Sequence, residues 1–352
     1  MTALHFVLPG DPETRTGGFI YDARIIAGLR AKGLEVAVHA LPDGFPEPSA
    51  AALEAAAALF AGLPDGARVV VDGLALGVLP EILRPHAERL ELVALVHHPL
   101  AAENGLSPAR REELFALEQA ALTLTPQVIT TSRNTAESLA SYGVAAERIA
   151  AVPPGVDPAP LAEGSQVGGS EGGPLALLTV GSLVPRKGHE VLFTALAQLA
   201  ELDWRLTCAG SLARDPALVA RLRGLCAENG LESRVDFRGE VADAELERLY
   251  DGADFFVLAS LYEGYGMVYT EAVARGLPVI ATRTGGVPEA VPAGAGILVP
   301  PGDAAALAQT LRRVIGEPEA YAELRTGARA ARASLADWDA SAAAFGAALG
   351  LL

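Results

Sequence analysis

Short apolar segments that alternate with helical segments are the feature that most constrains how this chain can fold. LHFVLPG, EVAVHAL, ARVVVDG and LELVALVHH predict strands, and GGFIYDARIIAGLRAKG predicts a helix between the first two. The strands contain continuous runs of Val, Ile and Leu rather than a strict alternation of apolar and polar residues. Such runs are typical of parallel strands covered on both faces. The pattern therefore predicts an α/β fold built on doubly wound sheets.

The alternation occurs twice, on either side of the Gly- and Ser-rich segment 163–173, which predicts a linker or mobile loop. A chain of 352 residues fits two domains of about 150–200 residues each. We expect an N-terminal Rossmann-like domain over residues 1–155 and a C-terminal one over 156–335, with a helix over 336–352 that could return to the first domain. Ligands of open α/β sheets bind beyond the carboxyl ends of the strands, so two such domains facing each other would form a cleft.

Charge and composition exclude several classes of protein. The formal net charge is −16, so the chain offers no basic field for nucleic acid or for an anionic membrane. The two cysteines, Cys208 and Cys226, are too few for a disulfide framework and too far apart in sequence for a metal site, and we expect buried thiols. The N-terminus does not resemble a signal peptide, and no apolar run reaches about 18 residues, so we expect a cytoplasmic protein.

A basic pair follows the first strand of the second half, in the segment GSLVPRKG. Gly181 allows a tight turn there, and Arg186 and Lys187 precede a helix that begins near Gly188. A helix N-terminus beside Arg and Lys is a favourable site for phosphate. The chain has only two lysines, Lys32 and Lys187, and one of them falls at this position. The alternative interpretation is a solvated basic turn.

Two carboxylates follow another strand, in the segment LYEGYGMVYTEA. Glu263 lies in a loop where Gly264 and Gly266 would let the backbone approach a ligand, and Glu271 lies in the first turns of the next helix. Two carboxylates at such a place can accept hydrogen bonds from the hydroxyls of a ribose or a hexose. The alternative for Glu271 is an exposed helix acid. The segment ATRTGGVPE then places Glu289 at another strand end, where it could equally be an acid favoured by the helix dipole.

No residues suggest a metal site. The one Asp-x-Asp sequence, Asp337-Trp338-Asp339, lies in the helical C-terminal tail, and we interpret it as helix surface with Trp338 packed. The basic pair and a helix dipole can neutralise a diphosphate instead. The first strand is also not followed by G-x-G-x-x-G, which a nicotinamide dehydrogenase would need.

The run VGSLVPRKG … EGYGMVYTEAVARGLPVIATRTGGVPE … GILVPPGD resembles family 4 glycosyltransferases, which are retaining enzymes of the GT-B type. The first half contributes TGGFIYDARIIAGLRAKGLEVAVH, LVHH and VPPGVD, so the resemblance covers essentially the whole chain. The Glu263 to Glu271 spacing, combined with the basic pair and the later glycine pair, is more specific than any one of these pieces. One departure is Ser182, where many members have arginine; Arg186 can supply that guanidinium.

The resemblance implies a role for each matching residue. Arg186 and Lys187 would hold the donor diphosphate, Glu271 the ribose hydroxyls and Glu263 the donor sugar. Backbone near Gly18 would approach the sugar phosphate, His97 would contact the transferred sugar, and backbone from Arg238 to Val241 would receive the base. The expected catalytic residues are His97, Glu263, Arg186 and Lys187; the expected donor-binding residues are Gly18, Gly181, Arg186, Lys187, Arg238, Val241, Glu263, Gly264, Tyr265, Gly266, Met267 and Glu271.

The function implied is transfer of a hexose, with retention, from a nucleotide-diphosphate sugar such as a UDP- or GDP-sugar, with no cofactor and no metal. The acceptor is not encoded in any motif. We expect a soluble small molecule or sugar and no stable membrane binding, because the first 155 residues carry 11 Lys and Arg against 18 Asp and Glu. Two alternatives stay open: a non-catalytic nucleotide-sugar-binding protein, and a sugar phosphorylase of the same fold, which would need a Schiff-base lysine.

Overall fold

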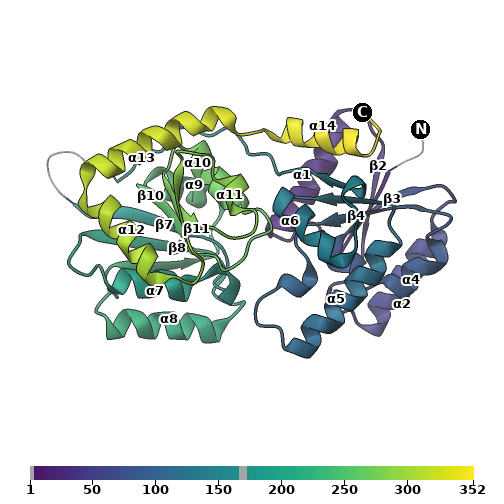
Figure 1. Ribbon diagram of the computed structural model, residues 1–352, viewed down its shortest axis with the longest axis horizontal. Coiled ribbons are helices and arrows are strands. Elements are labelled where there is room, and N and C mark those ends of the chain that lie inside the picture. Colours follow the sequence, from purple (N-terminus) through teal and green to yellow (C-terminus); the bar gives the residue numbers. More distant parts are fainter. Residues whose placement is uncertain (1–3, 166–172) are drawn as a thin grey trace. The chain divides into compact units, whose positions relative to one another are not determined.

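The computed structural model describes residues 4–165 and 173–352 (Figure 1). Most of the predicted linker, residues 166–172, lies outside the described residues. The chain divides into two compact units, the first formed by Met1–Gly155 and Ala336–Leu352 and the second by Val156–Leu335. Within the described ranges, no helix combines the length and the hydropathy that crossing a membrane requires.

The first unit is built on a six-stranded sheet with the order β2-β1-β3-β4-β5-β6, and each neighbouring pair is parallel. The chain order reverses between β1 and β3, so a crevice can open there beyond the carboxyl ends of the strands. The strands are β1 Leu4–Leu8, β2 Val36–Ala40, β3 Arg68–Asp72, β4 Glu91–Val96, β5 Gln127–Thr130 and β6 Ile149–Ala151; the helices are α1 Gly17–Ala31, α2 Ala50–Gly62, α3 Gly73–Leu76, α4 Pro80–Leu83, α5 Pro108–Thr123, α6 Arg133–Ser138 and α14 Trp338–Ala348.

Both faces of this sheet are buried, as the continuous apolar runs predict. Val69 and Val71 of β3 pack into one hydrophobic cluster, whereas Val70 packs into a different one with Phe6 and Leu95. Because successive strand residues point to opposite faces, a strand covered on both sides needs an apolar side chain at every position. Burying each such side chain stabilises the fold by roughly 1.5–3 kcal/mol.

Helix α14 closes the first unit by packing along α1 (Figure 1). The packing is close, since a Cβ added at Gly28 of α1 would come within 2.4 Å of the Ala342 Cβ. Asp337 caps α14 by accepting a hydrogen bond from the Ala340 amide at 2.8 Å, and Asp339 pairs with Lys32 at 2.6 Å. Trp338 packs against the cluster around Phe6, so the prediction that the Asp-Trp-Asp sequence is helix surface with a packed tryptophan is confirmed.

The second unit repeats the architecture with a six-stranded sheet of order β12-β11-β10-β7-β8-β9, again parallel throughout. Here the chain order reverses between β7 and β10. The strands are β7 Leu175–Val180, β8 Trp204–Ala209, β9 Val235–Gly239, β10 Phe255–Leu258, β11 Val279–Thr282 and β12 Gly296–Val299; the helices are α7 His189–Ala197, α8 Pro216–Glu228, α9 Asp243–Asp251, α10 Met267–Ala274, α11 Val287–Ala290, α12 Ala304–Gly316 and α13 Pro318–Ala331.

The second sheet is also covered on both faces. Phe255 and Val257 of β10 pack into a cluster with Cys208 and Cys226, and Phe256 packs into the cluster on the other face. Both cysteines are buried free thiols, which confirms that prediction. Helices α7, α8 and α12 lie together along one side of this sheet (Figure 1). The predicted α/β class with two doubly wound sheets is therefore confirmed.

Candidate active site

Several predicted site residues lie at the carboxyl ends of strands that border the two points of reversed chain order or are next to them. In the second unit, Gly181 follows β7 and Glu263 follows β10. In the first unit, Gly18 is the second residue of α1, the helix that follows β1, and His97 directly follows β4, the neighbour of β3. The carboxyl ends of strands at such a point are where open α/β sheets bind ligands. Each unit thus has its own cluster of polar side chains at this position.

The cluster of the second unit, which we call the cationic cluster, consists of Arg186, Lys187 and Glu263. Glu263 Oε1 accepts from Lys187 Nζ at 2.6 Å, and Glu263 Oε2 lies 3.1 Å from Arg186 Nη1. The Glu263 side chain is 7% exposed, against 22% for Arg186 and 14% for Lys187. Ser260 adds a hydrogen bond from its Oγ to Oε1 at 2.7 Å. One buried acid therefore holds two cations together, and the cluster carries a net positive charge.

Glycines make the cationic cluster possible. Arg186 and Lys187 lie in a 3-10 turn, Pro185–Lys187, and Gly188 follows at φ 65° as the residue before α7. A Cβ at Gly188 would lie 1.8 Å from the Ala259 carbonyl oxygen, so a side chain is excluded by contact as well as by backbone angle. The turn therefore packs directly on the strand end that leads to Glu263. It places both cations beside the N-terminus of α7, where the helix dipole also favours an anion.

Charge pairing decides the ionisation of Glu263. Burial raises the pKa of this carboxyl, but the ion pairs with Lys187 and Arg186 outweigh burial and lower the pKa to about 2. Glu263 is therefore a carboxylate at neutral pH. The loop around it is fixed by the second glycine pair, because the Gly286 amide donates to the Glu263 carbonyl at 2.9 Å and a Cβ at Gly285 would lie 1.9 Å from that oxygen.

The glycine loop continues into helix α10. Gly266 precedes the helix at φ 97°, and Met267 is its first residue. Tyr265 is partly buried and packs against the hydrophobic cluster that contains Phe256. Glu271 lies one turn further, where its Oε2 accepts from the Tyr250 hydroxyl at 2.9 Å. Burial raises the pKa of Glu271, partly opposed by that hydrogen bond. Glu271 is thus held by α9 through a neutral donor, separately from the ion pairs of Glu263.

The expected base-binding segment lies at the end of β9. Arg238 is in the strand, and its half-exposed side chain pairs with Asp236 at 2.6 Å and with Glu245 at 3.5 Å. Val241 follows the strand and is partly exposed. The Arg238 side chain is occupied by these two acids, which suits the expectation that backbone groups of this segment, rather than the guanidinium, receive a base. Glu289 lies in the first turn of the short helix α11.

The cluster of the first unit, which we call the imidazole cluster, consists of His97, Asp22 and Asp72. His97 Nε2 lies 3.1 Å from Asp22 Oδ1 and 3.1 Å from Asp72 Oδ2. Asp72 is held in place because its Oδ1 accepts from the Leu74 amide at 2.7 Å. A Cβ at Gly18 would lie 3.3 Å from His97 Cδ2, so Gly18 and His97 are direct neighbours.

The two acids determine the charge of the ring. Burial lowers the pKa of His97, but the two carboxylates outweigh burial and raise it to about 10. Burial raises the pKa of Asp22 to about 7, in spite of the favourable contact with His97. At neutral pH the ring is therefore an imidazolium that faces one or two carboxylates.

Sequence reasoning missed Asp22, Asp72 and Tyr250. Signals for the two acids were present. Asp22 lies four residues after Gly18 in a helix, which places it on the same face. Asp72 ends β3 as His97 follows β4, and the two strands are adjacent in the sheet. Tyr250 gave no signal, because a tyrosine inside an amphipathic helix is usually a packing residue.

Asp22, Asp72 and His97 are also the group of His and acidic residues within the described ranges whose ligand atoms converge, all within 4.8 Å, as a cation would need. The 3.1 Å separations are equally those of ordinary hydrogen bonds.

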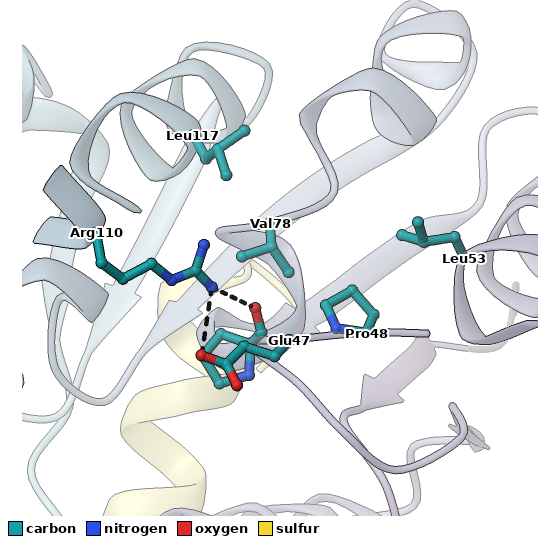
Figure 2. Close-up of a pocket in the computed structure, with 7 residues that line it drawn as sticks. Glu47, Pro48, Leu53, Val78, Arg110 and Leu117 are labelled. Atoms are coloured by element: carbon teal, nitrogen blue, oxygen red, sulfur yellow. Dashed lines mark hydrogen bonds and ion pairs between the residues drawn. The ribbon is translucent and has the colours of Figure 1, made fainter. Parts of the chain in front are cut away.

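A separate hollow of about 400 Å³ lies in the first unit and contains no predicted site residue (Figure 2). Its one guanidinium, Arg110, is occupied by Glu113 at 2.9 Å and by Glu47 at 3.8 Å. The residues that line it are Pro46, Glu47, Pro48, Leu53, Val78, Arg110 and Leu117.

Comparison with known proteins agrees with this geometry. Residues 163–331 match the family model "Glycosyl transferases group 1", and residues 70–160 match the model "Glycosyltransferase Family 4". The sucrose-phosphate synthase structure from Thermosynechococcus elongatus superposes with a TM-score of 0.82 at 24% identity, covering 99% of this chain and 98% of that one. This likeness shows that the two doubly wound sheets form the GT-B fold.

Two curated relatives indicate the family more directly. A D-inositol 3-phosphate glycosyltransferase of Corynebacterium efficiens is 35% identical over 53% of this chain and 48% of its own length. The chain thus spans about half the length of that relative. An MMP alpha-(1->4)-mannosyltransferase of Mycolicibacterium hassiacum is 30% identical over 85% of this chain and 74% of its own length. With the two family models, this similarity shows that the chain belongs to glycosyltransferase family 4.

Proposed function

We propose that this protein is a retaining glycosyltransferase that transfers a hexose from a nucleoside diphosphate sugar to an acceptor. The observation that carries the proposal is the cationic cluster. Arg186 and Lys187 are held together by one buried carboxylate at the N-terminus of α7. Two cations paired with one acid leave a positive charge that a diphosphate can neutralise. A solvated basic turn would not need a buried acid to hold its cations together.

In the proposed reaction the bond between the sugar and the diphosphate breaks, and the acceptor oxygen bonds to the same face of the sugar carbon. Arg186, Lys187 and the α7 dipole stabilise the negative charge that develops on the leaving diphosphate. An oxygen of that diphosphate takes the proton of the acceptor hydroxyl. No protein nucleophile is assigned.

The remaining residues receive roles from the family resemblance. We assign Glu271 to the ribose hydroxyls and the backbone at Arg238 to Val241 to the base. We assign the backbone near Gly18 to the sugar phosphate and His97 to the transferred sugar. Glu263 was expected to contact the donor sugar. Both of its oxygens are occupied by Arg186, Lys187 and Ser260, which supports an additional role in holding the two cations for the diphosphate.

The phosphorylase alternative is disfavoured by the lysines. A Schiff base with pyridoxal phosphate needs a deprotonated lysine amine. The chain has two lysines, and both are in ion pairs, Lys187 with Glu263 and Lys32 with Asp339, each at 2.6 Å. An absorbance scan that shows no pyridoxal band would agree with this argument.

We further propose that the acceptor is a soluble small molecule or sugar. The negative charge of the first 155 residues would be repelled by an anionic bilayer, and one relative is named for D-inositol 3-phosphate. Sedimentation with phosphatidylglycerol vesicles tests the proposal. Salt-reversible co-pelleting would contradict it.

A thermal-shift screen of UDP, GDP and their sugars tests the donor. A ligand at about 100 times its Kd stabilises the native state by about 2.7 kcal/mol, which a melting curve resolves. The active nucleotide sugar is then incubated with the protein and with candidate sugars and polyols. Release of the nucleoside diphosphate together with a glycosylated product supports transfer; binding without turnover of any acceptor would support the non-catalytic alternative.

A further inference from the structure

The orientation of the His97 ring has a consequence for which of its nitrogens a ligand can reach. Both carboxylates of the imidazole cluster approach the same atom, Nε2, each at 3.1 Å. The Asp22 side chain is 0% exposed and that of Asp72 is 5% exposed, whereas the His97 side chain is 21% exposed. Nε2 is therefore on the buried side of the ring, and it must carry a proton, because a carboxylate can only accept.

Packing fixes the plane of the ring as well. Tyr21 meets it edge-on with the ring centroids 5.4 Å apart, and the space left by the missing Gly18 side chain borders Cδ2 and Nε2. The Thr131 hydroxyl donates to the His97 carbonyl at 3.1 Å, which holds the backbone. Within residues 4–165 and 173–352 no hydrogen bond to Nδ1 is found. The Nδ1 edge is thus the part of the ring left for a ligand.

We propose that Asp22 is a positioning residue for glycosyl transfer. Together with Asp72 it holds Nε2 of His97, so that Nδ1 is the nitrogen that hydrogen-bonds the transferred sugar. This inference rests on the proposed function, because it assumes that His97 contacts the sugar. It adds a residue, Asp22, and a specific atom, Nδ1, to that assignment.

The charge of the cluster determines what Nδ1 can do. The groups that face the ring are Asp22 and Tyr21 from α1 and Asp72 from the end of β3, and only the two acids can carry a charge at neutral pH. They keep both ring nitrogens protonated, so Nδ1 donates a hydrogen bond to a sugar oxygen. Without the Asp22 carboxylate, one fewer negative charge faces the ring. The ring can then lose a proton or turn, and the donor at Nδ1 is lost.

The experiment combines imidazole NMR with kinetics on the full chain. Histidine side chains are labelled with ¹⁵N, and the His97 signals are identified by their loss in His97→Gln. In the parent at neutral pH we expect both nitrogens to be protonated. In Asp22→Ala we expect the signals of a neutral or exchanging ring, and a kcat lowered roughly 10- to 100-fold with a donor KM that changes little, since a charge-assisted contact is lost.

Two further variants keep the test decisive. Asp22→Asn retains an oxygen of the same shape without the charge, and covers the case in which Asp22→Ala does not fold; it should show the same NMR change. Asp339→Asn removes an exposed carboxylate from the same unit, and should alter neither the His97 signals nor kcat. His97 signals and kcat unchanged in folded Asp22→Asn would overturn the proposal.

The same samples distinguish a bound cation from a failure of the proposed function. If EDTA or added Mn²⁺ changes the His97 signals of the parent, the cluster holds a cation and the proposal is wrong. If the His97 signals respond to Asp22→Asn as expected but the parent transfers no sugar from any nucleotide sugar, the ring is held as described and the proposed function fails instead. In that case Asp22 is not a positioning residue for transfer.

Discussion

The two units have the same architecture but opposite charge at the points where their sheets reverse. In the second unit, one carboxylate lies between two cations, Arg186 and Lys187. In the first unit, two carboxylates meet one imidazole, His97. With every group ionised, the formal charge is +1 for the cationic cluster and −1 for the imidazole cluster.

The difference shows that the same type of fold can supply opposite fields at equivalent positions. Each cluster pairs its buried charges, because an unpaired buried charge is costly. The sign of the net charge of each cluster depends on whether it contains one buried acid or two. The single buried acid Glu263 balances only one of its two cations, so the remaining positive charge suits a diphosphate. The two buried acids of the other cluster balance the positive charge of the His97 ring, which therefore suits an uncharged hydroxyl.

The largest effect should come from removing the single buried acid. Glu263→Gln removes the carboxylate that pairs with both Arg186 and Lys187, and removing one partner of a buried ion pair typically costs about 3–5 kcal/mol. We expect the free energy of unfolding of the second unit to fall by that amount. The two tryptophans allow this to be measured, because Trp204 lies in the second unit and Trp338 in the first. In a Trp338→Phe background, urea unfolding followed by fluorescence reports on Trp204 alone.

Glu190→Gln is the matched control for this measurement. Glu190 pairs with Arg221 at 2.9 Å in the same unit, but both side chains are about half exposed. Exposed ion pairs contribute less than about 1 kcal/mol. Equal losses in the two variants would show that the cationic cluster is no more than a surface ion pair.

The two clusters should respond to pH in opposite directions. Glu263 has its pKa lowered to about 2 in the folded state, so its stabilising effect is present above about pH 4.5 and is lost as the pH falls toward 2. His97 has its pKa raised to about 10, so its effect is present below about pH 6.5 and is lost as the pH rises toward 10. Each pKa unit corresponds to about 1.4 kcal/mol.

Fluorescence of the two tryptophans at several pH values tests this difference. The gap in stability between the parent and Glu263→Gln should shrink in acid, and the gap between the parent and His97→Gln should shrink in alkali. Gaps that change in the same direction would contradict the opposite charges of the clusters.

The excess cation should be visible in ligand binding. Lys187→Ala and Arg186→Ala each remove one charge-assisted contact, worth about 1.5–3 kcal/mol, and we expect that loss for UDP or GDP but not for the free nucleoside. Calorimetric titration with the nucleoside and the nucleoside diphosphate gives the ratio of affinities. Lys32→Ala, which removes the other lysine from an ion pair with Asp339, is the control and should leave the ratio unchanged. Equal loss of affinity for nucleoside and diphosphate would argue against the diphosphate assignment.

Much of the fold could be predicted because its signals are local. The strands predicted in LHFVLPG, EVAVHAL, ARVVVDG and LELVALVHH are β1, β2, β3 and β4, and the helix predicted in GGFIYDARIIAGLRAKG is α1, because apolar runs and apolar periodicity mark them. The short helices Gly73–Leu76, Pro80–Leu83 and Val287–Ala290 were not predicted, since four residues are too few to show a helical period.

The candidate site was predicted only where a residue stood out against its neighbours. Lys187 did so as one of two lysines, and Glu263 did so directly before the glycines Gly264 and Gly266. The partners of His97 did not, because Asp72 also serves as a helix cap and Asp22, the single acid of its helix, resembles an ordinary surface residue in the sequence. That both contact one nitrogen depends on three elements meeting in space, and no local pattern contains that information.

The smallest expected effect concerns Glu271, a partly buried acid whose carboxylate accepts from the neutral Tyr250 hydroxyl. Tyr250→Phe removes the phenol that donates to Glu271 Oε2 at 2.9 Å. A neutral donor contributes about 0.5–1.5 kcal/mol, and on the proposed assignment that loss weakens the ribose contact. Affinity for nucleoside and for nucleoside diphosphate should therefore fall together, by about 2- to 10-fold, leaving their ratio as in the parent, in contrast to Lys187→Ala. Tyr321→Phe, which removes a phenol 3.3 Å from Asp254 in the same unit, should change neither affinity. If Tyr250→Phe instead changes the ratio, Glu271 contributes to the field around the diphosphate, and the cationic cluster is larger than Arg186, Lys187 and Glu263.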